Sequence, residues 1–246
     1  MNIDEILLLI AFIVIGIILL GDSVFKYYKI RLIKNTDEIS IAEAVDKSGM
    51  VQISGTPQKY REILNSPLGD DECFAYEYDV SKSRKSTADP EHDYRWKTVE
   101  EETQVVDFVL ADHSGTARIE TDSAEISLTH DTRHTIADSS AVPTTVPQDN
   151  AFFNPKNYNF EDRLRFKEGT IKSYDRIFII GEFDKTDDGE NSETCEINPD
   201  EKIYISSRNA ENEIKELRTP AIFEFIIGSS FLLFALAVII REFQLV

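Results

Sequence analysis

The sequence predicts a mainly β domain, a small barrel or sandwich, inserted between two transmembrane α-helices. Two observations lead to this fold class. Long uncharged runs stand near each end of the 246-residue chain, at positions 6–21 and 221–240. Between them, short segments alternate apolar and polar residues with a period of two, and turn-forming residues separate these segments. We therefore divide the chain into an anchor at 1–34, a soluble domain at 35–217 and a second helix at 218–246.

The first run, ILLLIAFIVIGIILLG, begins at Ile6 and ends at Gly21. Val24 and Phe25 extend its apolar length to a span of about 6–25, long enough for a bilayer core when tilted little. A cleaved signal peptide would have a basic start, whereas this chain starts with Asp4 and Glu5. We therefore expect an uncleaved anchor.

The second run, Ala221 to Ile240, has the length of a full span. Glu224 falls in its first turn, where a carboxylate can reach the membrane interface. Small residues lie at similar depth in both runs, with Gly16 in the first and Gly228, Ser229 and Ser230 in the second. They permit close approach, so the two helices either pair here as a hairpin or carry these residues facing lipid.

Charges beside the two runs predict their orientation. Four basic residues follow the first run on the domain side: Lys26, Lys29, Arg31 and Lys34. The charged residues before the run are Asp4 and Glu5, which are both acidic. By the positive-inside rule the domain lies in the cytoplasm and both termini lie outside.

The net charge is −19, from 45 acidic and 26 basic residues. Such a surface repels phosphate backbones, so we expect no nucleic-acid partner. An acidic excess of this size also fits a halophilic protein, in which salt screens the repulsion between the charges.

Within the domain, the spacing of Ser40 and Glu43 is that of a capping box and predicts a short helix that ends near Ser48–Gly49. The strands are expected at 50–55, at 73–80, in two pieces around the polar EEETQ segment within 96–110, and at 116–121, 125–129, 158–166, 176–183 and 201–206. The strand at 176–183 is the most apolar and is predicted to be central. A loop is expected at 131–155, and a polar helix at 209–218 leads to Pro220 and the second span.

Three groups of residues contain the residue types of known sites. His130 and His134 have the HxxxH spacing of a zinc pair, but two solvated histidines are the simpler interpretation. Asp112-His113-Ser114 contains hydrolase residue types, yet adjacent residues cannot form a triad, and a turn is favoured. The segment Asp184 to Cys195 has the composition of a calcium loop without its spacing, so a hairpin tip near Asp188-Gly189 is expected, with weak cation binding left open.

The aromatic residues Trp96, Tyr76 and Tyr78 either line a ligand groove or belong to the core, as strand aromatics usually do. Cys73 and Cys195 allow one disulfide without requiring it, and Cys73 is interpreted as a buried strand thiol. The sequence therefore predicts no catalytic residue, no cofactor site and no metal site.

A series of short motifs occurs in one order between the two runs. They are Ser66-Pro67-Leu68, Cys73 with Tyr76 and Tyr78, Trp96, the turn Asp112 to Arg118, Glu161 to Arg163, Tyr174 to Glu182, and Tyr204 to Ser207. In this order the chain resembles the GIDE family of MAPL-like mitochondrial E3 ubiquitin ligases. The resemblance implies a "beside a membrane" (BAM) domain between two transmembrane helices. It also implies a domain facing the intermembrane space, which corresponds to the outside of a cell; we follow the flanking charges, because they belong to this chain.

Ligase activity in that family resides in a RING finger, which needs about eight Cys and His ligands for two zinc ions. This sequence holds two Cys and four His, so the RING cannot be carried over. We therefore expect a membrane-anchored, non-catalytic interaction module with an unidentified protein partner at the membrane surface. The alternative is a substrate-recruiting component of an E3 ubiquitin transferase whose RING another chain supplies.

Overall fold

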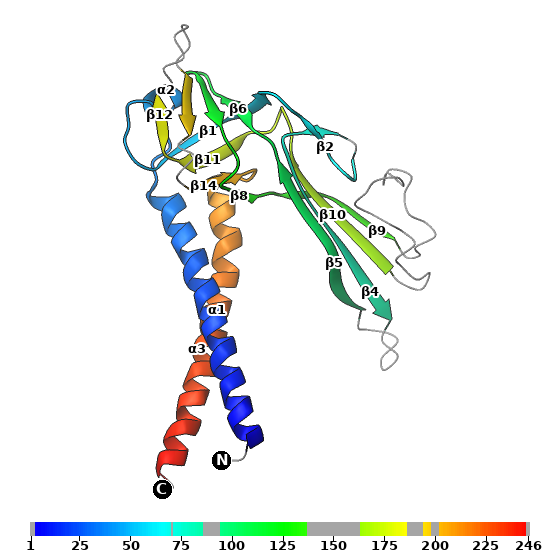
Figure 1. Ribbon diagram of the computed structural model, residues 1–246, viewed down its shortest axis with the longest axis vertical. Helices are drawn as coiled ribbons and strands as arrows, with labels where there is room; N and C mark the ends of the chain where they lie inside the picture. The colour runs from blue at the N-terminus through cyan, green and yellow to red at the C-terminus, as the bar shows by residue number, and fades with distance from the viewer. Residues whose placement is uncertain are drawn as a thin grey trace. The chain divides into compact units, whose positions relative to one another are not determined.

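The computed structural model describes residues 3–69, 71–85, 94–136, 163–185, 194–197 and 202–244. It divides the chain into two units: a helical unit from the two ends, Met1–Asp37 and Asn209–Val246, and a β unit, Glu38–Arg208. The mainly β domain flanked in sequence by two long apolar helices is confirmed (Figure 1).

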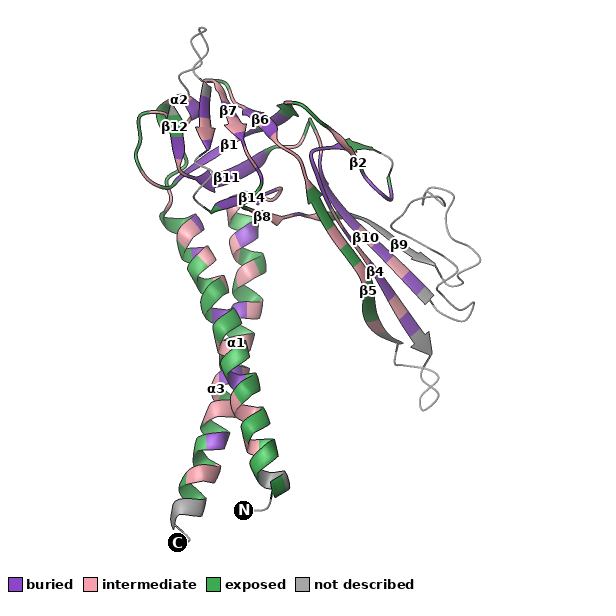
Figure 2. Cartoon of the chain, viewed as in Figure 1, coloured by how far each residue is buried: buried purple, intermediate pink, exposed green. Residues whose placement is uncertain are grey.

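The helical unit consists of α1, Ile3–Asn35, and α3, Ala210–Gln244. Both are long and apolar enough to cross a membrane, and in each only 11% of the most apolar window is buried. Figure 2 shows most of both helix surfaces as exposed. Apolar side chains in such numbers are stable where lipid covers them. α3 continues through Pro220, where we expected a junction, at the cost of about one backbone hydrogen bond.

The two helices pack against each other at their glycines, as the hairpin hypothesis requires. A Cβ added at Gly228 would lie 3.0 Å from the Gly16 carbonyl oxygen, and one added at Gly16 would lie 2.9 Å from Leu232. The aromatic ring of Phe12 lies 5.3 Å from that of Phe231. Small residues therefore let the two backbones approach closely, which drives helix pairing in lipid by van der Waals packing.

Polar contacts also join the two helices, at the C-terminal end of the first apolar run and the N-terminal end of the second. The hydroxyl of Ser23 donates to the Ala221 carbonyl oxygen at 2.8 Å, and the ammonium of Lys26 pairs with the carboxylate of Glu224. A charge pair in an apolar setting is tolerated because each charge offsets the other.

The β unit is built mainly of two sheets, and the large sheet runs in the order β12-β13-β7-β6-β1-β11-β14-β8. Its pairs are antiparallel except β13–β7 and β14–β8, which are parallel. Its strands are β1 Val51–Lys59, β6 Phe108–Ala111, β7 Thr116–Ile119, β8 Ala124–Ser127, β11 Ile177–Gly181, β12 Phe183–Lys185, β13 Thr194–Ile197 and β14 Ile203–Ser206. β11 is buried along its whole length and paired on both sides, as its apolar sequence predicts.

The second sheet runs in the order β5-β4-β10-β9 and is antiparallel throughout (Figure 1). Its strands are β4 Ala75–Lys85, β5 Tyr94–Val105, β9 His130–Ile136 and β10 Arg163–Ile171. A small hairpin, β2 Leu64–Asn65 with β3 Glu72–Cys73, adds a third pairing. Each of these two sheets has an apolar cluster. That of the first sheet includes Ile53, Phe108 and Ile179. That of the second sheet includes Tyr76, Tyr78 and Phe166.

Several predicted boundaries were wrong. The segment EEETQ does not interrupt a strand but lies inside β5, because the hydroxyls of Tyr76 and Tyr78 donate to its polar side chains. The segment 130–136, which overlaps the expected loop at 131–155, is strand β9; the remainder of that expected loop lies outside the described residues. The helix α2, Ile41–Ala44, has the predicted capping box at Ser40 and Glu43 but ends before Ser48.

Candidate functional site

A polar groove lies in the described part of the β unit, with a volume of about 760 Å³. It lies where β1 changes partner: residues 51–55 pair with β11, and residues 56–59 pair with β6. Gly55 stands at this change, and a Cβ there would lie 2.4 Å from the Ala111 carbonyl oxygen. Only glycine permits such a close approach of two backbones, so the sequence places glycine where the groove is formed.

One wall of the groove is the turn between β6 and β7. The carboxylate of Asp112 accepts hydrogen bonds from the backbone N–H groups of Ile41, Ser114 and Gly115 at 2.7–3.0 Å, and the hydroxyl of Ser114 accepts one from Ala42. Burial alone would raise the pKa of Asp112, but these bonds together with that from the Ser114 hydroxyl lower it. The favoured interpretation of Asp112-His113-Ser114 as a turn is confirmed, and the turn also holds the start of α2.

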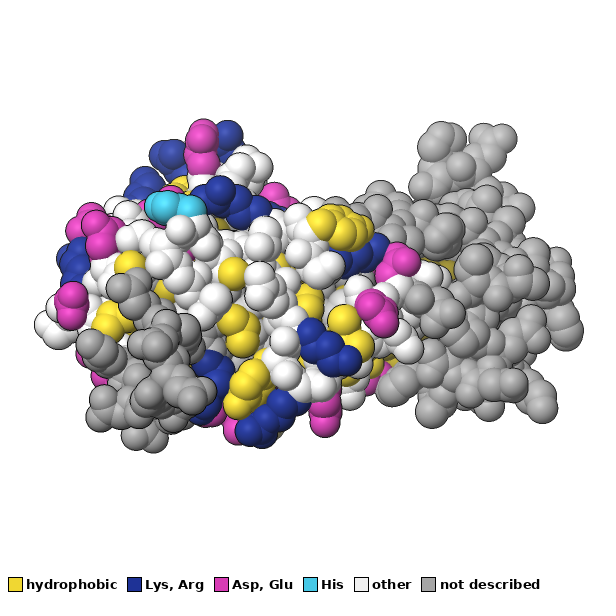
Figure 3. Space-filling view, turned by 90° about the horizontal axis from the view of Figure 1, so that it is seen from above, with side chains coloured by type: hydrophobic (Ala, Val, Ile, Leu, Met, Phe, Trp, Pro, Cys, Tyr) yellow, Lys and Arg dark blue, Asp and Glu magenta, His cyan; other side chains and the backbone are white. Residues whose placement is uncertain are grey.

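The groove carries both signs of charge. Glu38 and Glu43 supply carboxylates, Arg176 a guanidinium and His113 an imidazole, all on exposed side chains. Hydrogen bonds from the backbone N–H and hydroxyl of Ser40 lower the pKa of Glu43, which therefore keeps its charge at neutral pH. Acidic and basic side chains are likewise interspersed over the described surface in Figure 3. This lining is suited to hydrogen bonding and ion pairing with a polar segment of another molecule.

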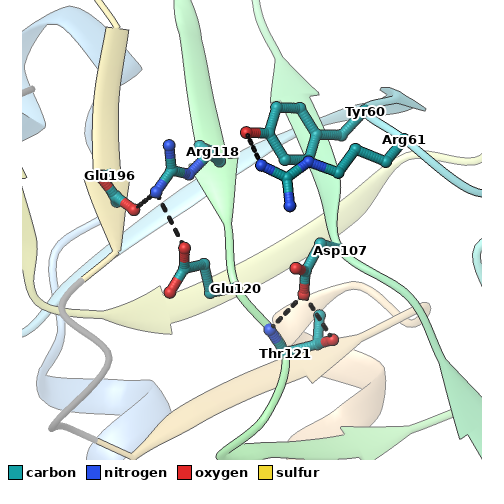
Figure 4. A network of polar contacts seen from close by, with 7 residues as sticks. All are labelled: Tyr60, Arg61, Asp107, Arg118, Glu120, Thr121 and Glu196. Atoms are coloured by element: carbon teal, nitrogen blue, oxygen red, sulfur yellow. Dashed lines mark hydrogen bonds and ion pairs between the residues drawn. The ribbon is translucent and has the colours of Figure 1, made fainter. Parts of the chain in front are cut away.

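A second polar cluster surrounds Arg118 on β7 (Figure 4). The guanidinium of Arg118 pairs with the carboxylates of Glu120 and Glu196, and it faces the ring of Tyr60 at 5.7 Å. Beside it, Asp107 accepts hydrogen bonds from the backbone and hydroxyl of Thr121 at 2.9 and 3.0 Å. The two carboxylates balance the charge of Arg118. The Arg118–Glu196 pair therefore links β7 to β13 and does not leave a free cation for a ligand.

A third group lies on the second sheet and contains a buried carboxylate. Glu168 of β10 is 2% exposed, and it accepts a hydrogen bond from the Leu68 backbone N–H at 2.8 Å. The hydroxyl of Ser66 accepts from the N–H groups of Gly69 and Asp71, which closes the loop above it. Burial raises the pKa of Glu168 although the bonds from Leu68 and Ser66 act in the other direction. This group fixes the loop between β2 and β3.

The family comparison matches residues 77–239 to the GIDE model, which is described as an E3 ubiquitin ligase. The chain belongs to the GIDE family. The same comparisons found no match among curated proteins or among solved structures. The GIDE match runs from β4 into α3, so it includes Asp112, His113 and Arg176 of the groove. The groove residues from β1 and α2 precede it.

The other candidate site residues of this GIDE chain, two histidines and the ends of the acidic segment 184–195, do not line the groove. His130 and His134 both belong to strand β9, not to a helix, and the His130 imidazole lies 3.7 Å from Glu77. No group of three or more potential metal ligands occurs in the described ranges. Asp184 and Cys195 lie on β12 and β13, which pair antiparallel as a hairpin requires; the expected tip at Asp188-Gly189 lies outside the described residues.

The two tyrosines and the two cysteines belong to the packed interior, whereas Trp96 is half-buried and belongs to neither apolar cluster. Tyr76 and Tyr78 are buried in the second apolar cluster, and Trp96 stacks with the Arg165 guanidinium at 4.5 Å. Cys73 and Cys195 are buried and unbonded to each other, and burial raises the pKa of their thiols to about 12 and about 11. The thiol of Cys73 is therefore a packed strand residue, as its sequence pattern indicates.

Sequence reasoning missed the groove and the buried Glu168. Glu38, Gln58 and Arg176 are far apart in sequence and belong to no motif, so only the pairing of β1 with two partners brings them together. Glu168 lies in an alternating strand and follows the inward apolar residues Leu164 and Phe166, which is a signal that sequence alone supplies. An isolated acid on the apolar side of a strand indicates a specific buried partner.

Proposed function

We propose that this chain is a membrane-anchored, non-catalytic interaction module, whose groove between β1, α2 and the β6–β7 turn receives a polar segment of a protein partner. The groove carries the proposal, because it combines both signs of charge with unhindered access. Two of the described chemistry-bearing side chains have structural roles: Asp112 accepts hydrogen bonds from backbone N–H groups, and Cys73 is buried. Membership of the GIDE family supports a role connected with ubiquitin transfer.

The alternative is recruitment of substrate to an E3 ubiquitin transferase whose RING belongs to another chain. The family description favours it, and the two cysteines and four histidines of this sequence are too few for a RING. Deleting the chain from cells separates the two roles. Loss of ubiquitin conjugates on neighbouring membrane proteins would support recruitment, whereas unchanged conjugation would rule it out.

Filling the groove tests the module directly. Thr56 is exposed on β1 and lines the groove, so Thr56→Trp should fill the hollow without disturbing the fold. We expect partners that co-purify from solubilised membranes to fall at least tenfold by quantitative mass spectrometry. Lys59→Trp is the matched control, because Lys59 is exposed on the same strand outside the groove lining. Equal recovery of partners with both variants would refute the groove as the binding site.

The proposed orientation, with the domain in the cytoplasm and both termini outside, rests on the basic residues at the domain end of α1. Cys73 and Cys195 have no exposed surface, so the probe must be introduced at an exposed position such as Tyr174→Cys, where the native side chain is 74% exposed. We expect a membrane-impermeant maleimide to label this variant only after the cells are opened. Labelling in intact cells would place the domain outside.

A further inference from the structure

An apolar groove lies between α1 and α3 within the helical unit, with a volume of about 380 Å³. Both helices contribute to its lining, which consists of Ser23, Val24, Tyr27, Ala221, Ile222 and Phe225. The hydroxyl of Ser23 is already bonded to the Ala221 carbonyl oxygen, so the wall offers a ligand almost entirely apolar surface. The volume falls within the range of about 300–1,000 Å³ that is typical of ligand sites.

The groove lies at the level where both apolar runs end. The first run, extended by Phe25, ends here, and the second begins at Ala221. The hydrogen bond between Ser23 and Ala221 places these two ends side by side in the antiparallel helix pair. Tyr27 is 67% exposed and lies just beyond, as tyrosines do at the membrane–water interface. The groove therefore meets the hydrocarbon of one leaflet next to its headgroups.

Two arginines flank the interfacial end of this groove. Arg31 follows Tyr27 by four residues on α1, and Arg218 precedes Ile222 by four residues on α3. Residues four apart share a helix face, so each arginine lies one turn beyond the lining on the face that carries it. Both side chains are exposed and make no hydrogen bond or ion pair with the residues that the structure describes.

The directions of the two helices bring these side chains toward one level. From the Ser23–Ala221 contact, Arg31 lies eight residues further along α1 and Arg218 three residues back along α3, a difference of about 7.5 Å along the helix axis. Side chains lean toward the N-terminus of their own helix, so Arg31 leans toward the groove and Arg218 leans toward the level of Arg31. Two guanidinium groups that approach from opposite directions can bind one phosphate between them.

We propose that this groove binds an anionic phospholipid, with an acyl chain between α1 and α3 and the phosphate between Arg31 and Arg218. The acyl chain covers the apolar lining, and the phosphate offsets the two guanidinium charges. Free phosphate would leave the lining uncovered, and a further apolar helix would leave the arginines without an anion. Lys26, which is nearer the groove, is already paired with Glu224.

Lipid binding by the full-length chain in detergent tests the proposal, with native mass spectrometry as the measurement. We expect dioleoyl phosphatidylglycerol to bind with a Kd at least about tenfold lower than dioleoyl phosphatidylcholine, whose ammonium is repelled by the arginines. Inorganic phosphate should not displace the phosphatidylglycerol. Equal affinity for the two lipids, or displacement by phosphate, would overturn the proposal.

Removing the arginine charges tests the headgroup contacts. Arg31→Gln and Arg218→Gln should each raise the Kd for phosphatidylglycerol about fivefold, and together about 25-fold. Lys29→Gln is the matched control. Lys29 is two residues from both Tyr27 and Arg31, so it lies on the opposite face of α1, and its ammonium lies over the ring of Phe25 at 4.4 Å. An equal loss with Lys29→Gln would mean that only the general positive charge matters, and the site would be refuted.

Filling the groove tests the acyl contact. Val24→Trp should raise the Kd for both lipids at least about fivefold, because the indole occupies space that the chain needs. Val14→Trp, at an exposed position of α1 outside the groove lining, should leave both affinities unchanged. Melting temperatures check that each variant folds. Unchanged binding by Val24→Trp, or a second transmembrane polypeptide retained in place of lipid, would contradict the assignment.

Discussion

The substitution Gly228→Leu is expected to separate α1 from α3. A Cβ at this position would already lie 3.0 Å from the Gly16 carbonyl oxygen and from a carbon of Leu20, so a leucine cannot be accommodated while the helices stay in place. Overpacking of this kind costs about 1–3 kcal/mol, and backbone neighbours yield less than side chains. With Phe12→Cys and Phe231→Cys as reporters, whose native rings lie 5.3 Å apart, we expect disulfide formation across the helix pair to fall at least tenfold.

Gly21→Leu is the matched control. Gly21 belongs to the same helix pair, but a Cβ added there meets nothing within 4 Å. This variant should therefore form the reporter disulfide at the wild-type rate. If both glycine variants behaved alike, close approach at Gly16 and Gly228 would not be what holds the helices together.

The substitution Glu168→Ala is expected to give a large loss of stability in the β unit. It leaves the buried Leu68 N–H without an acceptor and opens a cavity beneath the loop between β2 and β3. An unsatisfied buried donor costs about 1–3 kcal/mol, and the cavity adds to that cost. Thermal unfolding, with amide exchange at Leu68 as the local measurement, should show both effects. Glu72→Gln, at an exposed position on β3, should leave both unchanged.

The isosteric variant Glu168→Gln gives a pH test of the same site. Burial raises the folded-state pKa of Glu168 above its unfolded value, so the stability that its protonated form contributes is present at low pH and is lost as the pH rises through the folded pKa. Glutamine does not titrate. We therefore expect the wild type to lose stability relative to Glu168→Gln as the pH rises from 4 to 8. A slope of the opposite sign would contradict a raised pKa.

The sequence predicted the parts of this fold whose signals are local. Uncharged runs predict α1 and α3, the Ser40–Glu43 spacing predicts the start of α2, and the apolar run at 177–181 predicts a central strand. The errors arose where distant residues decide the outcome. EEETQ is a strand because tyrosines on β4 supply hydrogen-bond donors, and β1 continues past Gly55 because β6 replaces β11 as its partner.

The candidate site was less predictable for the same reason. The Asp112 turn has a local signature, and the sequence predicted it as a turn. Its second role, to hold the N–H of Ile41, depends on a residue 71 positions away. Glu38 and Arg176 are single charges in unremarkable contexts, and they become neighbours of one groove only through strand order. Residue types predict what a side chain can do, whereas topology decides which side chains do it together.

The pairing of the first and last helices also has a consequence for biosynthesis. Ser23 and Ala221, which are hydrogen-bonded, are 198 residues apart. At a translation rate of about 5–20 residues per second, α1 waits roughly 10–40 s after it leaves the ribosome before its partner exists. During that interval Lys26 has no Glu224 with which to form an ion pair, and Gly16 has no Gly228 to pack against. The nascent anchor is therefore open to foreign helices or to insertion-assisting factors until α3 has been made.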